Sequence, residues 1–469
     1  MSTVADRSSA TSASLRSNSL SLTETISQSV ANMAPTITPA INITVVAQLA
    51  GVGAWASFFI ATIAILFVGL NISSLAKRHT VAGSFFLYIG RNMGPFVGVL
   101  SGWAMIAAYV VNSICVVVGG YIFASNMMTG LGLQSYMPPQ WLFDTIFTLL
   151  VGYLVYRDVR LSSRISLVLE GVSILIIGAI TWRLVSHHPG GVFATQQLNF
   201  HALKLAPIML GLSFATFAFA GFESSATLAK ETRNPKRNIP FAILFSSSLA
   251  GVLFTLVAYF MTLAVNDNSS IIGNSSSPFA EMTQRAGLSW AAAVVYFAAL
   301  ISSLGCNLAN FNAAARIIFS MSRYQYIHRS LQYVHQTHQT PAGAILFCTI
   351  AVCVGCTLLL NLAPVDAFGY AGTFAVFGFV LIYFLVCIAA PLDMKRFARL
   401  RFRNLLVSAV GAILMLGVFV GSIYPLPPYP YNLIPYVFLG YMLIGAVWFS
   451  ILKRRNANAL SAIEHDLES

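Results

Sequence analysis

Long apolar runs follow one another along almost the whole chain of 469 residues, with short polar stretches between them. A bilayer core is about 30 Å thick and is crossed by roughly 20 apolar residues in a helix, whose backbone groups all pair internally. Only 9% of the residues are charged, whereas soluble domains carry about 25%, so a water-soluble protein is excluded. The sequence therefore predicts an all-α polytopic membrane protein with about 12 transmembrane helices. The expected spans are residues 25–50, 53–76, 95–125, 140–156, 161–185, 206–229, 239–265, 289–319, 341–361, 366–390, 404–423 and 431–452.

The basic residues fall on one side of these spans. If both termini lie in the cytoplasm, all 26 lysines and arginines are cytoplasmic except Arg183, Lys204 and Arg285. Membrane proteins show this bias towards cytoplasmic basic loops, so we predict cytoplasmic termini and a location in the cell (plasma or inner) membrane. The charges are scattered over short loops, which argues against nucleic acid as a partner and favours contact with anionic lipid headgroups of the bilayer.

The segments outside the spans are short. We expect residues 1–24 to form a disordered cytoplasmic tail without a signal peptide, residues 25–452 the transmembrane domain, and residues 453–469 a cytoplasmic C-terminal tail. No nucleophile–base set is found in the loops, so the sequence predicts neither an enzyme nor a cofactor. The spacing of Cys353 and Cys356 is not completed by a second pair or a histidine, so no zinc-type site is predicted. Movement of a solute across the membrane remains, with a channel or a transport-inactive sensor as the alternatives.

Two spans carry residues that interrupt a helix. In the first span, Pro35 and Pro39 each remove a backbone donor. In the sixth, Gly221 is followed by the carboxylate of Glu223 within an apolar stretch. These would be the first helices of two five-helix halves, and breaks at matching places mark the binding site of a transporter. Amides freed at a half-helix N-terminus can hold a carboxylate, and freed carbonyls can hold a cation.

Several motifs resemble those of one transporter family. They are residues 219–225 and 231–240 around the sixth span, 82–84 with 94–95 and 102–103, and 312–316 with 321–323. Over about residues 25–400 the chain resembles the amino acid–polyamine–organocation (APC) superfamily. The resemblance implies a leucine-transporter-type fold of two inverted five-helix repeats, about 25–185 and 206–390, plus two C-terminal helices at about 404–452. It also implies a permease for amino acids or related small amines that works by alternating access. An exchanger or a polyamine transporter is the alternative.

The resemblance also suggests where the substrate binds. The backbone of the first break is expected to face that of the sixth, with Phe222 or Tyr109 as an aromatic lid. The residues of the two breaks are Met33, Ala34 and Thr36, and Phe219, Ala220 and Gly221. Many family members carry Gly-Ser-Gly in the first break, where this chain has Ala34-Pro35-Thr36. Proline offers no N–H, so recognition of a substrate carboxylate cannot be copied over unchanged.

Acidic residues inside the predicted spans are few, and such residues are functional candidates by default. Glu223 follows the sixth break, and a carboxyl in apolar surroundings can bind and release a proton, so we assign it a gating or proton-coupling role. Glu170 has either a coupling role or a structural one, paired with Arg164 or with serine and threonine hydroxyls. Asp144 and Asp366 are expected to be solvated near the outer interface. So few acids favour a zwitterionic or monovalent substrate over a polyamine.

A sodium site is the competing hypothesis for ion coupling. Residues 299–303 match the Ala-x-x-Ser/Thr-Ser/Thr pattern that forms a sodium site in sodium-coupled relatives, which would place the ion on Ala299, Ser302 and Ser303. A carbonyl and two hydroxyls suit a hard cation. Proton-coupled relatives often carry a lysine on the fifth span, where this chain has Ser173. The resemblance is strongest around Glu223, so symport with a proton is favoured over sodium, and no other metal is predicted.

Overall fold

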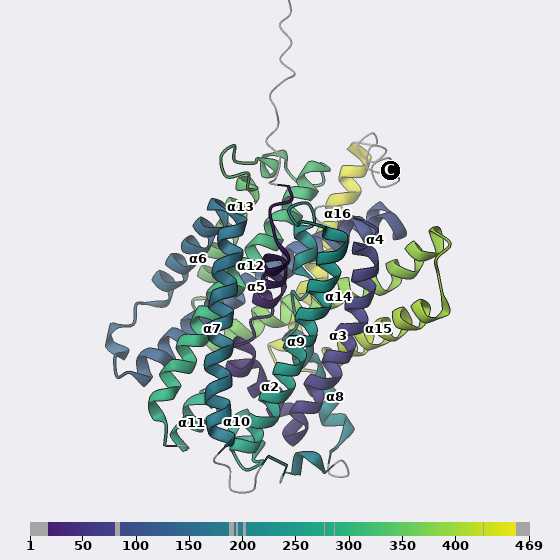
Figure 1. Cartoon of the computed structure of the whole chain (residues 1–469). Helices are drawn as coiled ribbons and strands as arrows, with labels where there is room; N and C mark the ends of the chain where they lie inside the picture. The colour runs from purple at the N-terminus through teal and green to yellow at the C-terminus, as the bar shows by residue number, and fades with distance from the viewer. Residues whose placement is uncertain are drawn as a thin grey trace, which may run out of the picture.

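The computed structural model describes residues 17–79, 85–186, 192–193, 196–199, 203–275, 277–285, 287–424 and 426–455. Within these ranges the regular elements are helices, and the one isolated β-bridge joins Leu20 to Thr232 (Figure 1). The α-helices are α1 (Leu22–Asn32), α2 (Ile43–Ala50), α3 (Ala54–Ala76), α4 (Phe85–Met93), α5 (Pro95–Gly130), α6 (Gln140–Arg157), α7 (Val159–Val185), α8 (Leu205–Phe217), α9 (Pro235–Ala264), α10 (Ser269–Gly273), α11 (Pro278–Arg285), α12 (Ser289–Arg323), α13 (Ala342–Leu359), α14 (Pro364–Arg396), α15 (Phe402–Gly421) and α16 (Ile434–Arg455).

The described residues contain nine helical segments that are long and apolar enough to cross a membrane. One of them, Thr38–Ala76, covers parts of the first two predicted spans, because only a short 3₁₀ turn with Gly51 at a φ of 61° separates α2 from α3. Helix α6 covers the fourth predicted span but is not among the nine, since Gln140, Asp144 and Arg157 make it more polar. The chain is therefore a polytopic all-α membrane protein, and the number of twelve crossings and the inverted repeat stay predictions.

The core of the molecule lies around α5 and α12. The apolar segment of α5 is 89% buried within the protein, against 22% for α15. A helix that is apolar all round and buried lies at the centre of a bundle, and α5 packs against α12 and α14. Helices α13, α15 and α16 expose many large apolar side chains, as expected for helices that face lipid.

Both predicted helix breaks are confirmed. The first span ends its α-helix at Asn32, passes through Ala34 with a φ of 46°, and resumes in a π-helix over Thr38–Asn42. The sixth ends its α-helix at Phe217, passes through Gly221 with a φ of 84°, and continues as a 3₁₀ helix over Ser224–Leu228. The prolines cause the first break because they lack the backbone donor, and glycine adopts the left-handed conformation of the second at little cost.

The N-terminal segment is ordered further towards its start than the sequence predicts. Helix α1 begins at Leu22, and a capping box joins Ser21 to Glu24. The backbone N–H groups of Ser19 and Leu20 both donate to the Glu231 carbonyl, at 2.7 and 2.8 Å. Residues 19–24 thus contact the helical part of the protein, and the predicted domain boundaries stay predictions. Residues 1–16 and 456–469, and the 82–84 part of the family motif, lie outside the described residues.

Candidate functional site

The two helix breaks touch at Gly221. A Cβ atom on this glycine would lie 2.4 Å from Oδ1 of Asn32, the last residue of α1, so no side chain fits there. Asn32 is 2% exposed, and neither its amide nitrogen nor its amide oxygen has a hydrogen-bond partner among the described residues. The Thr36 hydroxyl is likewise buried and unpaired. Buried polar groups are nearly always paired, so the unpaired groups of Asn32 and Thr36 at the first break, which faces the sixth, are the groups that a polar ligand would satisfy.

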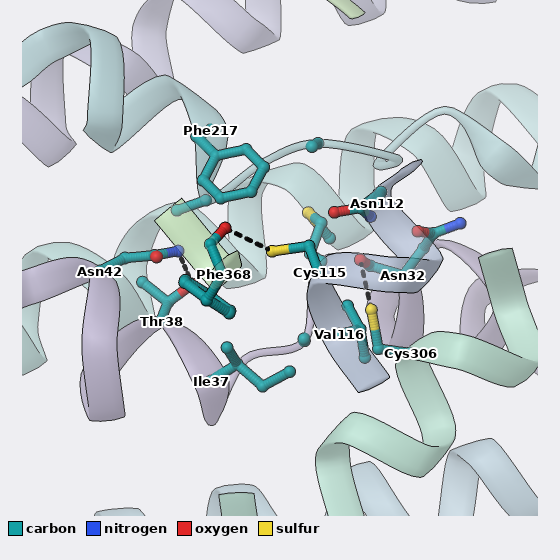
Figure 2. Close-up of a pocket in the computed structure, with 14 residues that line it drawn as sticks. Asn32, Ile37, Thr38, Asn42, Asn112, Cys115, Val116, Phe217, Cys306 and Phe368 are labelled. Atoms are coloured by element: carbon teal, nitrogen blue, oxygen red, sulfur yellow. Dashed lines mark hydrogen bonds between the residues drawn. The ribbon is translucent and has the colours of Figure 1, made fainter. Parts of the chain in front are cut away.

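A cavity of about 30 Å³ lies beside these breaks (Figure 2). Its lining comes from the first and sixth spans and from α5, α12 and α14, and it includes the thiols of Cys115 and Cys306, which donate to the carbonyls of Phe368 and Asn32. One water needs at least about 10–15 Å³, so the cavity has room for water, and a larger solute requires the helices to part. The lining residues are Asn32, Met33, Ala34, Ile37, Thr38, Asn42, Asn112, Cys115, Val116, Phe217, Ala218, Ala220, Cys306 and Phe368.

The predicted substrate residues divide into two groups. Met33, Ala34 and Ala220 line the cavity, whereas Thr36, Tyr109, Phe219, Gly221 and Phe222 do not. The last five are buried but lie outside the cavity lining. The Phe219 ring packs edge-on against Phe254 with centroids 5.3 Å apart, and the Phe222 ring packs against Tyr383 at 5.2 Å. Asn32 and Asn112 line the cavity as well, although the sequence did not single them out as site residues.

Glu223 lies fully buried just beyond the sixth break and is held by two tyrosines. Its Oε1 accepts a hydrogen bond of 2.7 Å from the Tyr109 hydroxyl on α5, and its Oε2 accepts one of 2.6 Å from the Tyr383 hydroxyl on α14. The Gly221 N–H donates to the same Tyr383 oxygen at 3.2 Å. When Glu223 is ionised, both of its oxygens can accept from the two phenols. If Glu223 took up a proton, one oxygen would become a donor, and one phenol bond would have to be remade.

Glu170 on α7 lies 1% exposed against α12. The Ser302 hydroxyl approaches both of its oxygens, at 2.8 and 3.0 Å. Arg164 instead pairs with Glu24 at 2.8 Å, so the predicted alternative of a Glu170–Arg164 pair is wrong and the hydroxyl contact is confirmed. The pKa of Glu24 is lowered: burial opposes ionisation, but the hydrogen bonds from the Ser21 backbone N–H and from Arg164 outweigh it.

Of the residues of the predicted sodium site, Ser302 contacts the Glu170 carboxyl group. The Ser303 hydroxyl donates to the Ala299 carbonyl at 2.8 Å, one helical turn back on α12. Ser173 on α7 donates to the Ala298 carbonyl at 3.0 Å. A carbonyl, two hydroxyls and the Glu170 carboxylate are the oxygen ligands that a hard cation takes. The same carboxylate is also the group that a proton would neutralise.

Asp144 and Asp366 differ in their surroundings. Asp366 lies in the first turn of α14 and is exposed at the protein surface, and its solvation near the outer interface stays a prediction. Asp144 on α6 is 2% exposed, and the expectation that it is solvated is wrong. The reason is packing, because α6 contacts α5, α12 and α13.

A buried ion pair joins α12 to the segment that follows the sixth span. Arg316 on α12 is fully buried and donates from Nε and Nη2 to both oxygens of Glu231, at 2.8 and 2.9 Å. Its Nη1 donates to the Asn312 side chain at 2.9 Å. Because Ser19 and Leu20 donate to the Glu231 carbonyl, one network joins the N-terminal segment to α12. Both partners lie in motifs of the family resemblance, residues 231–240 and 312–316, but no sequence pattern pairs them.

Comparison with known proteins agrees with this architecture. The family model for amino acid permeases matches residues 24–455. The branched-chain amino acid permease BcaP of Bacillus subtilis is 26% identical over 346 residues, which cover 68% of this chain and 70% of that protein. The glutamate/serine transporter AimA of Bacillus subtilis is 27% identical over 317 residues, 64% of this chain and 58% of that protein. The low-affinity putrescine importer PlaP of Escherichia coli is 24% identical over 327 residues, 67% of this chain and 71% of that protein. With most of its length matched, this chain belongs to the amino acid permease family of the APC superfamily.

Proposed function

We propose that the protein is a secondary active transporter that moves amino acids or related small amines by alternating access. One observation carries this proposal: two broken helices meet at a cavity where the Asn32 amide is buried without a partner among the described residues. Interrupted helices with free polar groups are how membrane transporters bind small polar substrates. The relatives, which are transporters for branched-chain amino acids, for glutamate and serine, and for putrescine, support the same class of substrate.

The cavity favours an amino acid over a polyamine. No charged side chain is among its lining residues, whereas several ammonium groups would need several carboxylates. Since Pro35 offers no N–H in the first break, we propose that the Asn32 amide nitrogen donates to the substrate carboxylate. Carbonyl groups of the breaks would then accept from the substrate ammonium.

Proton coupling at Glu223 is the mechanism we favour. With both oxygens accepting from Tyr109 and Tyr383, the ionised carboxylate ties the sixth span to α5 and α14. Protonation would weaken that tie, and the sixth span could then move relative to its neighbours. A second site is Glu170 with Ser302, where either a proton or sodium could bind. An exchanger without ion coupling is the alternative, followed by a channel or a sensor.

Transport assays in proteoliposomes separate these possibilities. Labelled leucine, serine, glutamate and putrescine are offered under an imposed pH or sodium gradient, and we expect concentrative uptake of an amino acid driven by the pH gradient. Uptake that occurs only when the proteoliposomes already contain unlabelled substrate would identify an exchanger. Flux without accumulation would identify a channel. Binding without flux would identify a sensor and refute the proposal. In the plasma membrane, we expect the protein to be oriented with both termini in the cytoplasm.

A further inference from the structure

A second and larger cavity lies away from the substrate site. Its volume is about 900 Å³, and it opens between the end of α3, the end of α14 and the start of α15, with Leu244 of α9 at its wall. These three helices pack against one another. The lining residues are Leu70, Asn71, Ser73, Ser74, Lys77, Arg78, Leu244, Met394, Ala398, Arg399, Leu400, Arg401, Arg403, Asn404 and Val407. None of them lines the small cavity at the helix breaks.

The mouth of this cavity is strongly basic. No acidic side chain is among its lining residues, and five cationic ones are: Lys77, Arg78, Arg399, Arg401 and Arg403. Arg78 donates from Nε to Asp393, but its Nη2 is buried without a hydrogen-bond partner among the described residues. The other four are exposed, and no ion pair joins them to an acidic side chain in the part of the chain that the structure describes. An anion would therefore meet several uncompensated charges and one unpaired buried donor.

The lining of the cavity also has an apolar part. Leu70 lies seven residues before Lys77 on α3, about 10 Å along the helix, and it lines the cavity together with Leu244 and Val407. Beside the cavity on α15, the Phe402 side chain is 81% exposed, and Leu406 is 52% exposed. A cavity lined by basic residues on one part and apolar residues on another is complementary to a molecule with an anionic head and an apolar tail. Basic pockets between transmembrane helices bind anionic lipid headgroups in this way.

We propose that this cavity binds an anionic phospholipid, with the phosphate among the five cationic side chains and an acyl chain along Leu70 and the α15 surface. Bound there, the phosphate accepts from the free Nη2 of Arg78. The same guanidinium pairs with Asp393, which is 0% exposed and also contacts His79 at 2.8 Å. The lipid thereby stabilises the packing of α3 on α14. Tyr383, which donates to Glu223, lies on the same helix α14, and Phe368 of this helix lines the small cavity at the helix breaks.

Binding is tested on the full-length protein in a neutral detergent, independently of transport. Thermal unfolding is followed while phosphatidylglycerol, phosphatidylcholine or inorganic phosphate is added. We expect phosphatidylglycerol to raise the unfolding temperature and the other two to leave it unchanged. The variant Arg399→Gln/Arg401→Gln/Arg403→Gln should bind phosphatidylglycerol more weakly by about tenfold or more. All three side chains are exposed, so the fold should tolerate the change.

A matched variant removes three charges outside the cavity. Lys236→Gln/Arg237→Gln/Arg329→Gln changes exposed basic residues in loops and helix ends that are predicted to lie on the same side of the membrane, and its affinity should equal that of the unmodified protein. Equal affinities in both triple variants would overturn the proposal. Stabilisation by inorganic phosphate alone would identify a site for a soluble anion and overturn the assignment to a lipid. Stabilisation by phosphatidylcholine would show that the basic residues do not select the ligand.

Discussion

Replacing Tyr383 by phenylalanine should loosen the packing around the small cavity at the helix breaks, which is the proposed substrate site. The substitution keeps the ring that packs on Phe222 but removes one oxygen, which both donates to Glu223 and accepts from the Gly221 N–H. A hydrogen bond to a charged group contributes about 1.5–3 kcal/mol, and a buried amide left unpaired costs about 1–3 kcal/mol. Water that enters the loosened site recovers part of this. We therefore expect the closed state to lose about 2–4 kcal/mol.

The loss translates into more frequent opening. A difference of 1.4 kcal/mol is a tenfold change in an equilibrium, so the open population should rise by roughly 30-fold to several hundredfold. The Tyr109→Phe variant loses one bond to Glu223 but leaves no amide unpaired, so its effect should be smaller. The variant Tyr296→Phe is a control for the loss of a buried hydroxyl, because Tyr296 is a buried tyrosine on a different helix, α12. It should change the open population little.

A native thiol in the cavity lining reports this opening. Cys115 lines the cavity, so a small thiol reagent reaches it only when the helices part. The assay uses a protein in which the other cysteines are replaced by serine: Cys306, Cys348, Cys353, Cys356 and Cys387. The rate of Cys115 modification should rise in Tyr383→Phe by at least about tenfold, and less in Tyr109→Phe. Equal rates in Tyr383→Phe, Tyr296→Phe and the parent would refute the role of Tyr383 in closure.

Four further predictions concern binding, coupling and topology. Gly221→Leu should abolish substrate binding while the protein still inserts, because a Cβ there lies 2.4 Å from Asn32 Oδ1; an unchanged affinity would remove the sixth span from the site. Glu223→Gln should remove the dependence of uptake on a pH gradient, because an amide does not titrate, and retained dependence would move coupling elsewhere. If sodium drives transport, Ser302→Ala with Ser303→Ala should raise the sodium concentration for half-maximal uptake, and uptake that ignores sodium in the parent would exclude this site. A cysteine at Ser135 should react with an impermeant reagent in intact cells, whereas reaction only after permeabilisation would contradict the predicted topology.

The helix breaks could be predicted from the sequence because their causes are local. Pro35 and Pro39 act through their own missing N–H groups, and Gly221 acts through its own φ. The candidate gating or coupling role of Glu223 could be predicted because Glu223 follows that glycine closely in the sequence. None of these inferences needs a knowledge of which helices pack together.

The partners of these residues could not be predicted in the same way. Tyr383 lies 160 residues from Glu223, and nothing in its local sequence distinguishes it from the other tyrosines, of which the chain has 18 in total. Arg316 and Glu231 are 85 residues apart. Glu170 was left with two possible partners because the choice between Arg164 and a hydroxyl depends on how α7 packs on α12. Asn32 was missed since an asparagine at a helix end is common, and only the packing reveals that its amide has no partner.

The buried Glu231–Arg316 pair has properties that suit a gate better than a firm structural bond. Replacing a buried ion pair by well-packed apolar residues often stabilises a protein, whereas removing one partner alone costs about 3–5 kcal/mol. An apolar seal at this place would therefore favour the closed state strongly and slow its opening. In the ion pair, both charges regain water when the network to the N-terminal segment separates, which keeps the free energies of the closed and open states similar. The proposed alternating access needs two states of similar free energy, and the fully buried, bidentate contact between Arg316 and Glu231 can separate without leaving either charge buried and unpaired.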